Sequence, residues 1–174
     1  EARSIGTDIW YAPGVNIHRN PMGGRNFEYF SEDPVISGTM GARIIDGAWG
    51  QQLVTTIKHF ATNNQEEWRH RTNSVVDERT LNEIYFPVFK NAVQKAGVGA
   101  VMTSYNPING THAAESKKLI TDILKEGWGF DGIVMSDWRS TYTTIGCVES
   151  GLDLEMPSGF FLNYEAISEL IDRG

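Results

Sequence analysis

"IVMSDW", residues 133–138, is the stretch from which the fold can be worked out. The apolar run Ile133–Met135 is typical of a strand that is buried on both faces of a parallel sheet. The run ends abruptly in Asp137 and Trp138. A buried strand that ends in a carboxylate beside an indole predicts a polar site at the carboxyl end of that strand.

Four more apolar runs of this kind occur in the chain. They are Ile9–Ile17, Leu53–Phe60, Val98–Tyr105 and Leu152–Met156. Helical patterns lie between the runs, so strands and helices are predicted to alternate along the chain. Alternation with right-handed crossovers gives either an open doubly wound sheet or a (β/α)₈ barrel.

Caps and apolar stripes predict five helices. Their ranges are 34–47, 77–97 with a kink at Pro87, 116–127, 141–149 and 164–171. Asp33 is the predicted N-cap of the first helix and Ser116 of the third. Gly97 is the predicted C-cap of the second helix.

Polar residues at the strand ends favour the barrel. The side chains concerned are Asn16, His18, Lys58, His59, Ser104, Tyr105, Asn106, Asp137 and Glu155. In a barrel, the carboxyl ends of the strands converge on one mouth, where active sites lie. No G-x-G-x-x-G turn follows the first run, which argues against a nucleotide-binding doubly wound sheet. We therefore predict an α/β fold, a parallel (β/α) barrel of TIM type, present as an incomplete segment of about five βα units.

Composition excludes several classes of function. The 174 residues carry a formal charge of −7, which argues against nucleic acid as a partner. No apolar run reaches the roughly 18 residues that a membrane span needs. The spacing of His18, His70 and His112 is not that of a metal site, and we predict no metal or other cofactor. The single Cys147 says little about the compartment, which stays open.

Two interpretations fit Asp137: it caps the following helix, or it is a catalytic carboxylate. Trp138 favours the second, because an indole offers an apolar wall to a sugar ring. Lys58 and His59 end an apolar strand, where a buried ammonium group needs a partner. That partner is either a structural carboxylate or a sugar hydroxyl. A Schiff-base lysine, as in aldolases, is a further interpretation of Lys58.

Cations in the loops complete the predicted site. Arg25 and Arg69 lie in loops of short polar residues, a setting that suits a hydrogen-bonding pocket more than a charged surface. Tyr105 ends its strand, and its hydroxyl either contacts the carboxylate or packs against neighbours. Together, Lys58 and the two arginines should keep Asp137 ionised by favouring its charged form.

One carboxylate, several neutral and cationic donors and an aromatic wall suggest a neutral polyol ligand, and a retaining glycosidase is one enzyme that would bind it. The acid/base group of such an enzyme is harder to place in this sequence. Such an enzyme needs two carboxyl groups about 5 Å apart, one as nucleophile and one as acid/base. Asp137 suits the first role. Glu66, Glu67 and Glu155 are candidates for the second by location alone.

Five ordered motifs resemble glycoside hydrolase family 3, of the β-glucosidase type. They are "GGRNFEYFSEDP" (23–34), "KHFATNNQE" (58–66), "VMTSYNPING" (101–110), "GIVMSDW" (132–138) and "GLDLEMP" (151–157). The similarity covers roughly residues 8–159. Ala61 follows Phe60 where members of N-acetylglucosaminidase type have Pro, so that subtype and its Asp–His pair are not expected.

The resemblance implies a role for each site residue. Asp137 would be the nucleophile. Arg25, Lys58, His59 and Arg69 would bind the sugar, Tyr105 would lie beside the nucleophile, and Trp138 would line the first sugar subsite. The family's sugar-binding Asp is expected upstream of Glu1. Its acid/base Glu is expected from an α/β sandwich domain downstream of Gly174, which leaves structural roles for Glu66, Glu67 and Glu155.

The implied domain organisation and function follow. Residues 1–174 would be part of a (β/α)₈ barrel catalytic domain, with further strands upstream and the sandwich domain downstream. The enzyme would be a retaining, exo-acting glycoside hydrolase that releases terminal β-D-glucosyl residues from β-glucosides or oligosaccharides through a covalent intermediate on Asp137. Alternatives are a β-xylosidase or α-L-arabinosidase of the same family, and a non-catalytic sugar-binding relative. The segment alone is expected to be inactive.

Overall fold

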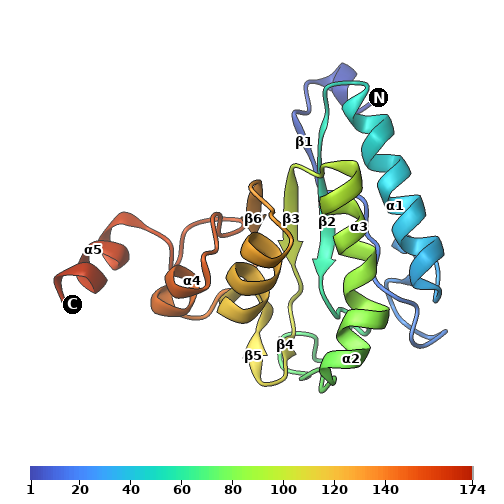
Figure 1. The fold of residues 1–174 in the computed structure, drawn as a ribbon. Helices are drawn as coiled ribbons and strands as arrows, with labels where there is room; N and C mark the ends of the chain where they lie inside the picture. The colour runs from blue at the N-terminus through green and yellow to red at the C-terminus, as the bar shows by residue number, and fades with distance from the viewer. Residues whose placement is uncertain (174) are drawn as a thin grey trace.

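The structure is a computed structural model that describes residues 1–173, and its centre is a four-stranded parallel sheet (Figure 1). The strands are β1 (Ile9–Trp10), β2 (Val54–Phe60), β3 (Ala100–Thr103) and β6 (Ile133–Met135), in the order β1-β2-β3-β6. Each strand pairs in parallel with the one before it. An order without reversal is that of a barrel, whereas a doubly wound sheet reverses its order at a switch point.

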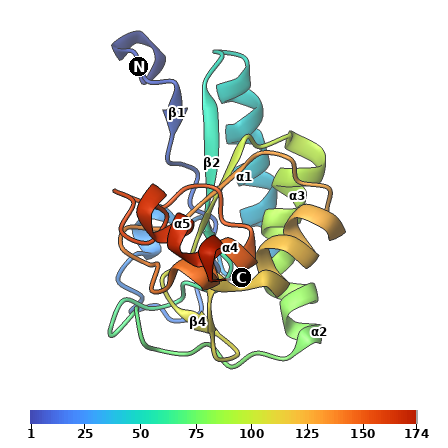
Figure 2. The same ribbon diagram turned by 90° about the vertical axis from the view of Figure 1, so that its left-hand side faces the viewer.

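Helices and short elements connect the strands. They are η1 (Arg3–Ile5), η2 (Asn26–Glu28), α1 (Pro34–Trp49), α2 (Glu78–Thr80), η3 (Leu81–Tyr85), α3 (Phe86–Ala96), the antiparallel pair β4 (Pro107–Ile108) and β5 (Thr111–His112), η4 (Ala113–Glu115), η5 (Lys118–Gly127), α4 (Thr144–Ser150) and α5 (Tyr164–Asp172). In Figure 2, α1 and α3 lie on the same side of the sheet. The predicted fold class is confirmed: the segment is an incomplete (β/α)₈ barrel of TIM type.

The two faces of the sheet have different cores, as alternation along a strand requires. Val101 and Val134 belong to the large core beneath the helices, together with Phe60 and the side chains of α1 and α3. Ala100, Met102 and Met135 form a second, small cluster of buried residues on the other face. The second cluster corresponds to the interior of the barrel.

The first helix forms as its cap predicts. The Asp33 carboxylate accepts hydrogen bonds from the N–H groups of Val35 (2.7 Å) and Ile36 (3.2 Å), and Pro34 occupies the first position of α1. The helix continues two residues beyond the predicted Gly47, to Trp49. The indole of Trp49 donates to the carbonyl of Gly97 at 2.9 Å, which ties α1 to the end of α3.

The second predicted helix is interrupted. Its start at Asp77 and its left-handed C-cap at Gly97 (φ 62°) are confirmed. Between them, Leu81–Tyr85 is π-helical, and α3 begins at the next residue, Phe86. Pro87 has no N–H to donate to the preceding turn, which explains why the regular pattern breaks at this point.

Two further helices differ from the prediction. The third is π-helical over Lys118–Gly127, with the Ser116 hydroxyl accepting the N–H of Leu119 at 3.3 Å. The fourth begins at Thr144, three residues later than predicted, because the Thr143 side chain caps it by accepting the N–H of Gly146 at 3.0 Å. The last predicted helix is confirmed as α5.

The first and fifth predicted strands are shorter than expected. After β1, pairing resumes only at an isolated bridge between Gly14 and Lys58, because Pro13 has no N–H for the ladder. The run 152–156 is not a regular strand. It joins the sheet through one bridge between Leu154 and Met135, and the Asp153 carboxylate replaces a backbone carbonyl by accepting the N–H of Val134 at 2.8 Å.

The described residues, 1–173, contain no helix that is both long and apolar enough to cross a membrane. Among the same residues, no three His, Cys, Asp or Glu side chains gather in a way that could hold a metal ion.

Candidate active site

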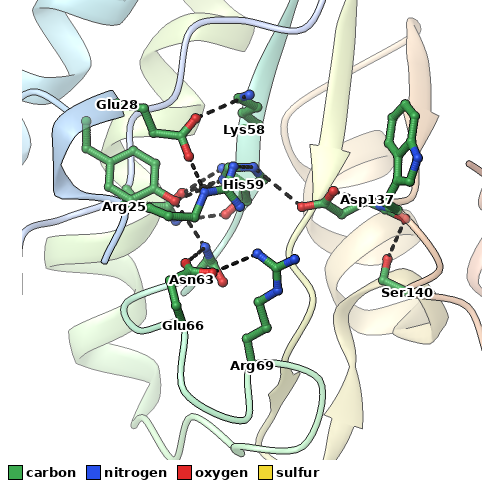
Figure 3. Close-up of polar contacts among 12 residues, drawn as sticks. Arg25, Glu28, Lys58, His59, Asn63, Glu66, Arg69, Asp137 and Ser140 are labelled. Atoms are coloured by element: carbon green, nitrogen blue, oxygen red, sulfur yellow. Dashed lines mark hydrogen bonds and ion pairs between the residues drawn. The ribbon is translucent and has the colours of Figure 1, made fainter. Parts of the chain in front are cut away.

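The carboxyl ends of β2, β3 and β6 bring the predicted site residues together (Figure 3). His59 lies in β2, Tyr105 follows β3, and Asp137 follows β6. His59 is 1% exposed and Asp137 is 5% exposed. The His59 Nε2 atom lies 3.5 Å from Oδ2 of Asp137, so side chains from two strands that are not neighbours meet at the mouth.

The two carboxylate oxygens of Asp137 have different surroundings. Oδ1 accepts the backbone N–H of Trp138 at 2.7 Å, which fixes the orientation of the group. Oδ2 is buried and has no hydrogen-bond partner among the described residues. Burial raises the pKa of Asp137, while the Trp138 N–H, the nearby Tyr105 hydroxyl and the charges of Arg25 and Arg69 oppose the rise. The predicted effect of the arginines is therefore correct in sign, but burial outweighs it.

The partners of His59 determine its protonation. Arg25 Nη2 lies 3.0 Å from Nε2, and a guanidinium group can only donate, so Nε2 is the acceptor and carries no proton. The proton therefore sits on Nδ1, which faces the Tyr29 hydroxyl (3.1 Å) and Oδ1 of Asn16 (3.3 Å). Burial, reinforced by the charges of Arg25 and Lys58, lowers the pKa of His59 well below its usual value. The ring is neutral and presents a lone pair to Asp137.

Glu28 joins two of the predicted cations, and sequence reasoning missed it. Its Oε1 pairs with Nε of Arg25, and its Oε2 lies 3.4 Å from Nζ of Lys58. All three side chains are mostly buried, at 16–20% exposure. The carboxylate partner expected for Lys58 is therefore present. The sequence feature that could have identified Glu28 is its position three residues after Arg25, a spacing at which opposite charges often pair.

Arg69 is held in a similar way. Its Nη1 donates to Oε2 of Glu66 at 2.8 Å, and Oε1 of Glu66 accepts from the Asn63 amide at 3.1 Å. The guanidinium carbon lies 3.9 Å from the centre of the Tyr105 ring, a cation–π contact. Burial and the charge of Asp137 raise the pKa of Tyr105 to about 12, so its hydroxyl keeps the proton.

An aromatic pair borders the mouth. Trp138 is 43% exposed, and the ring of Tyr11 meets it edge-on, with centroids 6.1 Å apart at 67°. Tyr11 follows β1, so the contact joins the two outer strands of the sheet across the mouth. Tyr11 lies inside an apolar run, so its place in the sequence does not indicate a position at the mouth.

Of the three candidate acid/base residues, Glu66 and Glu155 are hydrogen-bonded to other groups and Glu67 is exposed. Glu66 binds Arg69 and Asn63. Glu155 is 4% exposed, and it accepts the Thr141 hydroxyl at 2.7 Å and two backbone N–H groups of the following loop at 2.8 Å. Glu67 is exposed at the surface. These contacts agree with structural roles for Glu66 and Glu155.

Comparisons with known proteins show which family the chain resembles. The family model described as "Glycosyl hydrolase family 3 N terminal domain" matches residues 1–174. A β-glucosidase of Rhizobium radiobacter is 51% identical over 157 residues, which are 90% of this chain and 19% of that protein. An exo-α-(1→6)-L-arabinopyranosidase of Bifidobacterium longum is 49% identical, over 85% of this chain and 20% of that protein.

Solved structures give the same result. The β-glucosidase of Kluyveromyces marxianus in complex with glucose superimposes with a TM-score of 0.94 at 40% identity, over 97% of this chain and 20% of that chain. β-Glucosidase 3B of Thermotoga neapolitana, also in complex with glucose, superimposes with a TM-score of 0.90 at 42% identity, over 98% of this chain and 24% of that chain. The chain thus spans about a fifth of the length of the curated relatives it matches.

Proposed function

The chain belongs to the glycosyl hydrolase family 3 N-terminal domain family, and on this basis we propose that the protein is a retaining, exo-acting β-glucosidase. The observation that carries the proposal is the asymmetry of Asp137. One of its oxygens is fixed by the Trp138 N–H, and the other is buried without a partner in the described part of the chain. A nucleophile needs an oriented carboxylate with one oxygen free to form a bond.

In the proposed reaction, Oδ2 of Asp137 attacks the anomeric carbon of a bound glucoside. The bond from that carbon to the leaving oxygen breaks, and an acid/base carboxyl group gives its proton to that oxygen. A covalent glycosyl ester forms on Asp137. The same acid/base group then takes a proton from water, the water oxygen attacks the anomeric carbon, and the ester bond to Asp137 breaks.

We propose that the acid/base Glu lies outside this chain, in an α/β sandwich domain downstream of Gly174. Support comes from the acidic residues around the site: Glu28, Glu66 and Glu155 are each already bound to other side chains of this chain. The 174-residue chain alone should therefore hydrolyse no aryl β-glucoside.

The donors around Asp137 suit a neutral polyol. Arg25, Lys58 and Arg69 offer N–H groups, and their charges are largely balanced by Glu28 and Glu66. The Trp138 ring provides the apolar wall that a pyranose can stack on. We propose Arg25, Lys58, His59 and Arg69 as sugar ligands, with Tyr105 beside the nucleophile.

Covalent labelling tests the nucleophile. The full-length protein is treated with an activated 2-deoxy-2-fluoro-β-D-glucoside, which slows breakdown of the intermediate, and its peptides are mapped. We expect the label on the peptide that contains Asp137, none in the Asp137→Asn variant, and normal labelling in Asp131→Asn, which changes an exposed carboxylate. Label on a different carboxylate would remove the assignment.

An α-L-arabinopyranosidase is a second candidate, because one of the relatives bears that name. Comparing kcat/KM for p-nitrophenyl β-D-glucopyranoside, β-D-xylopyranoside and α-L-arabinopyranoside decides between the candidates. A protein that binds glucose but cleaves none of these would be a non-catalytic relative. The ion pair of Lys58 with Glu28 argues against a Schiff base, because an ion-paired ammonium is not nucleophilic.

A further inference from the structure

A cluster of four rings beside the site joins three loops. The Tyr142 hydroxyl and Nδ1 of His70 share a hydrogen bond of 2.9 Å. The His70 ring packs on Tyr105 with centroids 4.7 Å apart, and the His112 ring packs on Tyr142 at 3.8 Å. His70 follows β2, Tyr105 follows β3, and Tyr142 lies between β6 and α4.

Tyr142 is held at both ends. Oε1 of Glu115 accepts the backbone N–H of Tyr142 at 2.7 Å and that of Thr143 at 2.6 Å. The hydroxyl at the far end of the side chain reaches His70. The segment that leads away from Asp137 and Trp138 is therefore fastened to the loops after β2 and β3.

The hydrogen bond between Tyr142 and His70 joins two neutral groups. Burial and the charge of Arg69 lower the pKa of His70, so the imidazole is neutral at ordinary pH. Burial and the charge of Glu115 raise the pKa of Tyr142 to about 12, so its hydroxyl keeps the proton. The protonated hydroxyl of Tyr142 can therefore donate this hydrogen bond, and the unprotonated nitrogen of the neutral His70 ring can accept it.

We infer that Tyr142 and His70 form a positioning pair that holds Tyr105 and Arg69 in place for the sugar, an inference that rests on the proposed function. His70 is adjacent in sequence to Arg69, and both side chains contact the Tyr105 ring. Fixing the His70 ring from the Tyr142 side therefore limits the positions open to Tyr105 and to the Arg69 guanidinium. Neither His70 nor Tyr142 acts on the substrate itself.

Four variants of the full-length enzyme test the inference. Tyr142→Phe and His70→Phe each remove the hydrogen bond and keep a ring, and both should lower kcat/KM for an aryl β-glucoside about five- to ten-fold. The double variant should lose no more than either single one, because the two residues act as a unit. His70→Asn supplies an acceptor oxygen in place of Nδ1 but lacks the ring that packs on Tyr105, so it should recover only part of the activity lost in His70→Phe.

Tyr164→Phe is the matched control, because Tyr164 is 81% exposed on α5; its kcat/KM should not change. The inference fails if Tyr142→Phe lowers only the melting temperature and leaves kcat/KM intact, or if losses in the double variant add up. Wild-type protein that cleaves no glycoside, or an active Asp137→Asn variant, would instead overturn the proposed function. The two failures are therefore distinguishable.

Discussion

Nε2 of His59 and Oδ2 of Asp137 lie 3.5 Å apart and do not share a proton. Arg25 donates to the same ring nitrogen, so the imidazole faces the carboxylate with a lone pair. Neither the carboxylate nor a neutral imidazole protonated on Nδ1 supplies a donor to the other. Oδ2 of Asp137, the proposed nucleophilic oxygen, therefore forms no hydrogen bond with the His59 ring, although the two groups are close.

Replacing Asp137 by Asn should stabilise the protein at neutral pH. The folded-state pKa of Asp137 is raised above its unfolded value, so ionisation costs more in the folded state, and stability falls as pH rises from about 3.8 through the folded pKa. Removing the charge should therefore increase the free energy of unfolding near pH 7. The gain should shrink near pH 4. Urea unfolding of full-length protein at both pH values measures it.

Asp131→Asn is the control for that experiment, because Asp131 is exposed. Its stability should stay within about 0.5 kcal/mol of wild type at both pH values. An Asp137→Asn variant that is less stable than wild type near pH 7 would show that burial of the carboxylate does not outweigh the groups that favour its charged form.

Glu28→Gln should weaken sugar binding. A neutral amide cannot balance Arg25 and Lys58 together, so both cations lose their fixed positions. We expect a loss of about ten-fold in kcat/KM for an aryl glucoside, mostly as a higher KM, because these groups bind the ground state. Glu169→Gln, which breaks an exposed ion pair with Arg173, should leave both constants unchanged. An unchanged KM in Glu28→Gln would contradict this role.

Asn16→Ala should destabilise the fold. The buried Asn16 side chain accepts the N–H of His59 at 2.7 Å and donates to the carbonyls of His59 (2.8 Å) and Ala61 (3.3 Å). Alanine leaves these backbone groups unpaired, at a cost of about 2–3 kcal/mol. Asn82→Ala, on an exposed helical position, should change the free energy of unfolding by less than about 0.5 kcal/mol. Equal effects in the two variants would show that the hydrogen bonds of Asn16 to His59 and Ala61 do not stabilise the fold.

Two glycines should respond in opposite ways to alanine. At Gly132 an added Cβ would lie 2.3 Å from the Gly99 carbonyl oxygen and 2.7 Å from the Phe130 ring, so Gly132→Ala should cost about 2 kcal/mol or more. At Gly47 in α1 an added Cβ meets nothing within 4 Å. Gly47→Ala should stabilise by roughly 0.5–1 kcal/mol through helix propensity. Chemical denaturation of both variants shows whether the signs differ.

Features that depend on neighbours in sequence could be predicted. The Asp33-Pro34 pair gave the start of α1, and Gly97 gave the end of α3, because a cap acts within one turn. The strand ends were predicted from the change from apolar to polar residues. A parallel arrangement then required Lys58, His59 and Asp137 to lie at the same mouth.

Contacts between distant loops could not be predicted. Tyr142 meets His70, 72 positions earlier, and Tyr11 meets Trp138 across the mouth; neither pairing leaves a periodic pattern. The run 152–156 has the composition of a strand, yet the Asp153 carboxylate, and not a backbone carbonyl, accepts the hydrogen bond from the Val134 N–H. Periodicity reports which residues are buried, and it does not report which side chain substitutes for a backbone group.

The edge-on contact between Tyr11 and Trp138 depends on strand register. Tyr11 lies directly after the two residues of β1 that pair with β2. A deletion of one residue between Asp8 and Tyr11 would turn the phenol to the opposite face, because successive side chains alternate. The indole would then lose its aromatic neighbour, while the groups around Asp137 would stay as they are.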